Sequence, residues 1–206
     1  SSPESALAHF GLASAYQGRG RFDEARKEYG RSLQIAPDRA ETHYNLATLL
    51  GRAGRIAEAI EQYRAAIELE PTLHKALNNL GALYESEGKM EDAEEAYRRA
   101  ARAQPGQPGP HFNLGMLLEA DGRFPEAIEM YQEEIRVAPR DVRALNNLGR
   151  LLVAEGRTRE AIEVLERAVE ISAGAVTPTV NLAAAWLKHG DAARAETLAR
   201  RVLDGH

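Results

Sequence analysis

The sequence predicts an all-α protein in which six helix-turn-helix units, about twelve helices, stack into one solenoid domain over residues 1–206. Two series of small residues recur every 34 residues without a gap, and the apolar residues between them fall at helical spacing. A fixed period of this length is typical of repeat proteins, in which each repeat packs only on its neighbours. The first series is Gly20, Gly54, Gly88, Gly122, Gly156 and Gly190, and the second is Ala25, Ala59, Ala93, Ala127, Ala161 and Ala195.

Each repeat is expected to contain a helix A, a turn and a helix B, and the repeats span residues 6–39, 40–73, 74–107, 108–141, 142–175 and 176–206. In the third repeat we expect helix A over Lys75–Ser86 and helix B over Met90–Gln104. The recurring glycine lies between the helices, where a helix end favours a residue that tolerates positive φ. Proline, which cannot continue a helix interior, ends four of the repeats, at Pro37, Pro71, Pro105 and Pro139.

The core is expected to form where helix A carries a leucine followed by a small residue and helix B carries a large one. The leucines are Leu12, Leu46, Leu80, Leu114, Leu148 and Leu182. The large residues of helix B are Tyr29, Tyr63, Tyr97, Tyr131 and Leu165, and Ala199 weakens this layer in the last repeat. The proline-rich junction 104–110 is expected to be a rigid turn rather than a hinge, because the 34-residue register continues through it.

The third repeat carries a family resemblance in Asn79-Leu80-Gly81, Tyr84, Gly88, Ala93, Tyr97, Ala100 and Pro105. These residues resemble the tetratricopeptide repeat, and the resemblance covers all six units in register. It implies a right-handed α-solenoid whose A helices line a concave face, and a role in holding other proteins.

Composition narrows the possible partners and location. The net charge of −5 is of mixed sign, so no nucleic-acid footprint is evident, and the absence of cysteine excludes disulfides and thiolate metal sites. No apolar run approaches the ~18 residues of a membrane helix, and no signal peptide is visible. We expect a cytoplasmic protein without cofactor. Because it starts Ser-Ser-Pro without methionine, the chain is also interpreted as a processed or excised piece of something longer.

The candidate site is a ladder of asparagines, one per repeat, directly before the helix A leucine: Asn45, Asn79, Asn113, Asn147 and Asn181. Stacked helices are ~8–10 Å apart, and a polyproline-type strand completes a turn in three residues of ~3.1 Å each. Every third residue of such a peptide would therefore meet one amide, which offers both a donor and an acceptor. The ladder would hold an extended peptide by its backbone. The alternative is that the asparagines are solvated or bond locally within the stack.

The neighbouring positions supply further candidates. Directly before the ladder, aromatic and amide residues alternate at Tyr44, Asn78, Phe112 and Asn146. The aromatic rings are either anchors for partner side chains or packing groups against the next helix. Lys75 and Arg143 occupy equivalent positions two repeats apart, and Arg150 adds a further positive charge.

Two comparisons within the family bear on the ligand. The ladder is similar to the repeat arm of O-GlcNAc transferases, where such asparagines hold substrate peptides. A different subset binds acidic chaperone tails through two lysines, two asparagines and an arginine. The matching positions here are Phe10, Ser14, Asn45, Lys75 and Asn79, of which only Asn45 and Lys75 fit. Chaperone-tail binding is therefore not expected.

Catalysis finds no support in the sequence. His9, His43 and His111 share one position of helix A in different repeats, so they lie roughly 10 Å or more apart, whereas zinc ligands sit at ~2 Å from the metal. No phosphate loop, HExxH or nucleophile elbow appears. We expect a non-catalytic scaffold for an extended segment of a protein partner, with no nucleic-acid or membrane partner.

Two alternative functions stay open. One is the substrate-recruiting arm of a larger enzyme, such as a glycosyltransferase, whose catalytic part is not in this chain. The other is self-association through the C-terminal repeat. That repeat ends at His206 without a further polar helix, so Leu198, Val202 and Leu203 would face open space, a neighbouring chain or a missing continuation.

Overall fold

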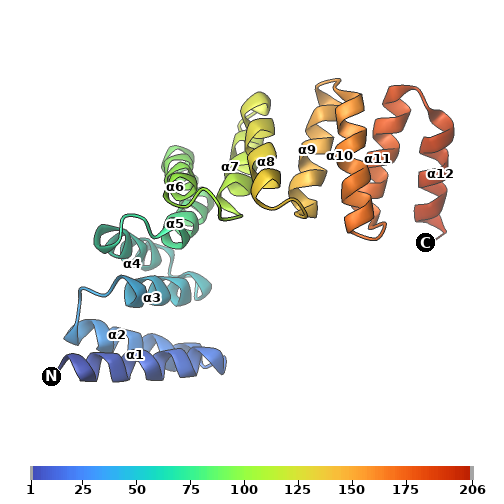
Figure 1. Cartoon of the computed structure of the whole chain (residues 1–206). Coiled ribbons are helices and arrows are strands. Elements are labelled where there is room, and N and C mark those ends of the chain that lie inside the picture. The colour runs from blue at the N-terminus through green and yellow to red at the C-terminus, as the bar shows by residue number, and fades with distance from the viewer. Residues whose placement is uncertain (1, 205–206) are drawn as a thin grey trace. The chain divides into compact units, whose positions relative to one another are not determined.

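The computed structural model describes residues 2–204, and these form twelve α-helices arranged as six antiparallel pairs (Figure 1). The chain divides into two compact units, an N-terminal unit over Ser1–Pro105 and a C-terminal unit over Gly106–His206. The predicted all-α repeat architecture is confirmed. The last two residues of the predicted sixth repeat, 205 and 206, lie outside the described residues.

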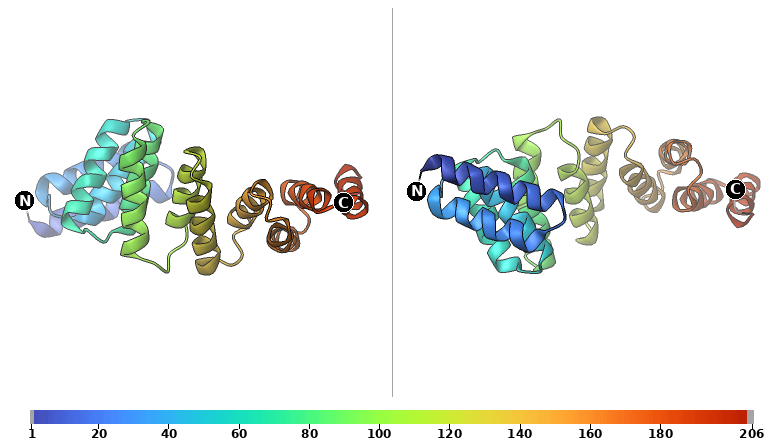
Figure 2. Two further views of the ribbon diagram at one scale, coloured as in Figure 1. Left: turned by 90° about the horizontal axis from the view of Figure 1, so that it is seen from above. Right: turned by 90° about the horizontal axis from the view of Figure 1, so that it is seen from below.

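The N-terminal unit contains three helix pairs. They are α1 (Pro3–Gly18) with α2 (Phe22–Ile35), α3 (Ala40–Arg52) with α4 (Ile56–Leu69), and α5 (His74–Ser86) with α6 (Met90–Ala103). The third pair matches the predicted bounds to within one residue at each end. Each A helix after the first also packs on the B helix before it, which joins the pairs into a stack (Figure 2).

The C-terminal unit repeats this arrangement. Its pairs are α7 (Pro110–Ala120) with α8 (Phe124–Val137), α9 (Val142–Ala154) with α10 (Thr158–Ile171), and α11 (Val176–His189) with α12 (Ala192–Leu203). Helices α9 and α11 also contact each other directly. The A helices of successive repeats are therefore neighbours, and residues at equivalent positions on them share one face of the unit.

The core lies between consecutive pairs. In the N-terminal unit, Leu77 and Leu80 of α5 pack with Ile60 and Tyr63 of α4. The side chain of Tyr63 is only 3 % exposed and that of Leu77 only 1 %. The turn glycine Gly88 has φ of 73°, as the position between helices A and B predicts. The repeat sequence therefore buries the residues that the 34-residue register assigns to the core.

Two predicted core positions are wrong, both at an end of the repeat series. Leu12 is 43 % exposed, whereas its counterpart Leu80 is 5 % exposed. The equivalent Leu46 packs against Tyr29 of the preceding repeat, and no described helix precedes α1 to cover Leu12 in the same way. Ala199 is likewise exposed on α12, which has no described helix after it. Burial of these positions requires a neighbouring repeat.

The start of α7 departs from the repeat pattern. The register predicts a first residue at position 108, but the helix begins at Pro110, preceded by Gly109 with φ of 111°. Proline at a helix start is tolerated because the first N–H groups have no intrahelical partner. The positive φ of Gly109 is one that other residues rarely adopt. The rigidity of the junction 104–110 stays a prediction.

Candidate functional site

The asparagine ladder lies on the side of the A helices where successive repeats meet. In the C-terminal unit, the Asn181 Nδ2 of α11 donates to the Asn146 Oδ1 of α9 at 2.8 Å, and the Lys188 Nζ donates to the Val153 carbonyl at 2.5 Å. All five ladder asparagines are half-buried. The face that carries the asparagines is therefore partly accessible to solvent, and hydrogen bonds between successive repeats cross it.

Two of the ladder amides bond to a tyrosine of the preceding repeat. Asn79 Nδ2 donates to the Tyr63 hydroxyl at 3.1 Å, and Asn147 Nδ2 donates to the Tyr131 hydroxyl at 3.2 Å. This is the local bonding that the sequence left open as an alternative. It uses one of the two N–H groups of each amide, and the Oδ1 acceptor has no hydrogen-bond partner among residues 2–204. The tyrosine therefore orients the amide without exhausting its hydrogen-bonding capacity.

Tyr131 connects the ladder to charged residues, and Tyr97 makes the same bond to a glutamate. Tyr131 donates to Glu119 Oε2 at 3.0 Å, and Arg150 forms an ion pair with the same carboxylate. Tyr97 donates to Glu85 Oε2 at 3.0 Å. Burial, together with the adjacent carboxylate, raises the pKa of Tyr97 and of Tyr131 far above that of a free tyrosine. Both hydroxyls are therefore held neutral, as hydrogen-bond donors to these carboxylates.

Two other ladder positions, Asn45 and Asn181, differ from this pattern. Asn45 makes no side-chain hydrogen bond to the described residues, and the Tyr29 hydroxyl of the preceding repeat bonds to Gln17 at 2.9 Å and to Ser14 at 3.2 Å. Asn181 bonds to Asn146 because Leu165 occupies the place of the tyrosine and has no hydroxyl. The ladder is therefore uniform in position but not in its hydrogen bonds.

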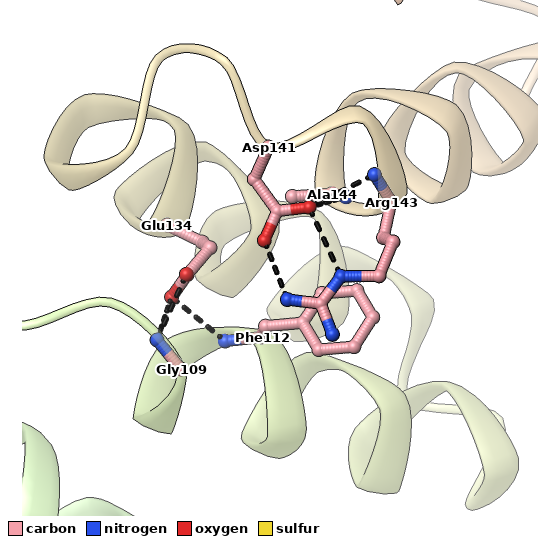
Figure 3. Close-up of polar contacts among 6 residues, drawn as sticks. All are labelled: Gly109, Phe112, Glu134, Asp141, Arg143 and Ala144. Carbon is pink, nitrogen blue, oxygen red and sulfur yellow. Dashed lines mark hydrogen bonds and ion pairs between the residues drawn. The ribbon is translucent and has the colours of Figure 1, made fainter. Parts of the chain in front are cut away.

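The two aromatic candidates have different surroundings. The half-buried Tyr44 ring packs against Tyr63 with centroids 5.9 Å apart. Phe112 is only 6 % exposed, and the Arg143 guanidinium lies 4.5 Å from its ring centroid (Figure 3). Phe112 is therefore a buried packing residue in this structure. A role for this ring as an anchor stays a prediction, and it would require Arg143 to move.

Asp141 holds Arg143 in place. Its carboxylate accepts from the Arg143 Nε at 3.2 Å and from the terminal nitrogen at 2.7 Å, and it caps α9 by accepting from the backbone N–H groups of Arg143 and Ala144 (Figure 3). Burial alone would raise the pKa of Asp141, but the hydrogen bonds from Arg143 and from the backbone outweigh burial and lower it. Lys75, at the equivalent position of α5, is exposed and forms no ion pair with the described residues. The two cations that the sequence treats as equivalent therefore differ in their contacts.

Glu134 is a buried capping residue beside the candidate site, and sequence reasoning missed it. Its side chain is 0 % exposed, and it accepts from the backbone N–H of Gly109 at 2.8 and 3.0 Å and of Phe112 at 3.2 Å (Figure 3). The equivalent residue in three other repeats is a buried alanine, at Ala66, Ala100 and Ala168. The carboxylate from α8 thus caps the shortened start of α7. The sequence signal for this role was a glutamate at a position where other repeats carry alanine.

The three histidines of helix A differ in their surroundings. His9 Nδ1 lies 2.6 Å from Glu28, and His43 bonds to Gln62 at 2.7 Å and to the Pro37 carbonyl at 2.8 Å. The Nδ1 of His111 is buried and has no hydrogen-bond partner in the part of the chain that the structure describes. Across residues 2–204, no three His, Cys, Asp or Glu side chains gather as they would around a metal ion.

None of the helices over the described range has both the length and the apolar character needed to span a lipid bilayer.

Comparison with known proteins agrees with the repeat pattern. Models of the tetratricopeptide repeat match residues 44–108 and 112–176, and two further models of the same repeat match residues 4–70 and 152–205. No protein of curated function matches this sequence.

Several solved structures share the fold. PilF of Pseudomonas aeruginosa superposes with a TM-score of 0.80 at 19% identity, over 97% of this chain and 90% of that one. YrrB, described as a TPR protein with an unusual peptide-binding site, has a TM-score of 0.73 at 20% identity, over 85% and 91% of the two chains. A structure of MamA has a TM-score of 0.73 at 24% identity, over 82% and 92%.

Proposed function

Because the chain belongs to the tetratricopeptide repeat family, we propose that it is a non-catalytic scaffold whose two units each bind an extended segment of a partner protein along their A helices. In the N-terminal unit the rungs are Asn45 and Asn79, and in the C-terminal unit they are Asn113, Asn147 and Asn181. YrrB, which shares this fold, is described as having a peptide-binding site, and that description supports the proposal.

The observation that carries the proposal is the state of the amides of Asn79 and Asn147. Each is oriented by one hydrogen bond to a buried tyrosine hydroxyl. At these half-buried positions the Oδ1 acceptor and the second N–H bond to none of the described residues. A peptide backbone offers one N–H and one C=O per residue, which is the complement of a free acceptor and donor. This orientation in the free protein lowers the entropic cost of binding, because the amide side chain loses little further freedom when the peptide binds.

The proposed ligand conformation follows from the spacing of the rungs. Adjacent helices in a stack lie ~8–10 Å apart, and a polyproline-type strand rises about 9 Å over its three-residue turn. Successive rungs would therefore meet equivalent backbone groups. Because these bonds go to the backbone, the ladder selects for an extended, solvent-accessible segment more than for a particular sequence.

Peptide selection followed by amide substitution tests the proposal. The native chain would be used to select from a displayed dodecapeptide library, and the affinity of the best peptide would be measured by fluorescence polarisation. Asn79→Ala/Asn147→Ala is expected to weaken binding about tenfold or more, since each lost hydrogen bond contributes roughly 0.5–1.5 kcal/mol. Circular dichroism would confirm that the variant is folded.

The matched control removes two amides from the B helices. Gln34→Ala/Gln132→Ala deletes exposed amides of α2 and α8 that make no side-chain bond to the described residues. It is expected to leave peptide affinity unchanged. Equal affinity of the native chain and the asparagine variant for every selected peptide would overturn the proposal and assign the asparagines to packing alone.

A further inference from the structure

Helix α11 presents a stripe of exposed apolar side chains. Val176, Val180 and Leu187 are 60 %, 48 % and 62 % exposed, and Ala184 between them is also exposed. Their spacing places them on one side of the helix. Single exposed apolar residues are ordinary, but a contiguous row on one face is typical of a binding surface. We refer to these four residues as the α11 stripe.

The α11 stripe continues the face that carries the ladder. On α9, the residues equivalent to Val180 and Leu187 are Asn146 and Val153, and both contact α11 through hydrogen bonds. The stripe therefore occupies the side of α11 that, on α9, meets the next A helix. No helix within residues 2–204 covers that side, and the side chains of the stripe are exposed there.

The neighbouring helix α12 is not built to receive another helix pair. The following repeat packs on Ile60 and Tyr63 of α4, but the equivalent residues of α12 are Glu196 and Ala199. Glu196 pairs with Arg200 at 2.6 Å, and both side chains are more than half exposed. A stacked helix pair would bury this ion pair, which costs desolvation energy. This ion pair therefore disfavours a stacked helix pair as the occupant of the stripe and leaves an extended segment as the better fit.

We propose that the α11 stripe binds a branched aliphatic side chain of the peptide held by the C-terminal unit, which makes it a determinant of sequence preference in a site that otherwise binds backbone. This inference rests on the proposed function. The charges agree with it: α11 contains no acidic residue, and the positively charged Lys188 is bonded to the Val153 carbonyl beside Leu187. The ligand is an aliphatic segment with neutral or acidic flanking residues.

The experiment compares peptide pools selected on two forms of the whole chain. The displayed dodecapeptide library would be selected in parallel on the native chain and on Val180→Ser/Leu187→Ser, and both pools would be sequenced. We expect leucine, isoleucine or valine to be enriched at one fixed position in the native pool and not in the variant pool. Replacing that residue by alanine in the best peptide should weaken binding to the native chain about tenfold and leave binding to the variant unchanged.

The other outcomes would overturn either the role of the α11 stripe or the proposed function. The same enrichment in both pools, or none in either, refutes the role of the stripe while peptides that depend on Asn147 still support the proposed function. Pools whose binding does not depend on the ladder asparagines refute the proposed function itself. Sedimentation that shows a dimer of the native chain but not of the serine variant assigns the stripe to a second copy instead. The control Leu69→Ser/Leu203→Ser alters exposed leucines outside the stripe and should reproduce the native pool.

Discussion

The close approach of α9 to α10 at Gly149 gives a sharp test of how the repeats pack. A Cβ built on Gly149 would lie 2.4 Å from Cγ of Leu165 and 2.7 and 2.9 Å from its two methyl carbons. Carbon atoms in contact are normally separated by about 3.5–4.0 Å. Leu165 is 0 % exposed, so its side chain cannot relieve the contact by turning into solvent. In some other repeats the residue equivalent to Gly149 is alanine, and there the residue equivalent to Leu165 is not leucine.

The expected magnitude follows from two opposed effects. Alanine in place of a helical glycine gains about 0.5–1 kcal/mol of stability, while overpacking a close-packed core costs typically 1–3 kcal/mol. Gly149→Ala is therefore expected to lower the free energy of unfolding by about 1–2 kcal/mol. Gly30→Ala, in the middle of α2, is the control, because a Cβ there would meet no heavy atom within 4 Å. It should raise stability by about 0.5–1 kcal/mol.

Urea unfolding, followed by circular dichroism and by the fluorescence of Trp186, would measure both changes. Trp186 is the chain's single tryptophan and lies in the C-terminal unit with Gly149. Leu165→Ala alone should cost about 2–5 kcal/mol, but on that background Gly149→Ala should no longer destabilise, because the clashing atoms are gone. The pair would then resemble Ala183 and Ala199 of the last repeat. The reasoning fails if Gly149→Ala is as stable as the native chain in the presence of Leu165.

Three further predictions concern buried polar groups and are all read as free energies of unfolding. Glu134→Ala introduces the alanine found in other repeats but leaves N–H groups at the start of α7 unpaired, so we expect the free energy of unfolding to fall by about 1–3 kcal/mol. Glu134→Gln should lower it less. Equal stability of the alanine variant and the native chain would contradict the capping role. His111→Leu removes a buried nitrogen that has no partner among the described residues, so stability should rise by about 1 kcal/mol. His43→Leu breaks two hydrogen bonds and should lower stability. A loss of stability in both variants would show that His111 has a partner. Asp141 has a lowered pKa in the folded state, so its contribution is present above the unfolded pKa of about 3.9 and is lost as pH falls through the lower folded value. Asp141→Ala should therefore cost about 1 kcal/mol at neutral pH, with a difference that shrinks in acid; a difference independent of pH would rule out the ionised cap.

The accuracy of the sequence predictions varies with how local the determining interaction is. The bounds of α5 and α6 were predicted to within one residue, because a helix and its glycine turn depend on residues close in the chain. The burial of Tyr63 was predicted from its register. The late start of α7 was not, because it depends on Gly109 and on a carboxylate that arrives from α8. The ladder positions were identified from sequence, but their hydrogen bonds were not.

The sequence by itself determined the repeat period, the helix pairs and the face on which the asparagines lie, because these follow from the 34-residue register and from helical periodicity. Only the tertiary structure decided that Asn147 gives one N–H to Tyr131, that Arg143 covers Phe112, and that the capping group of α7 is a buried glutamate. These outcomes depend on which side chains from different helices reach one another. Residues at equivalent positions in different repeats meet different neighbours, so the register places them without fixing the bonds they make.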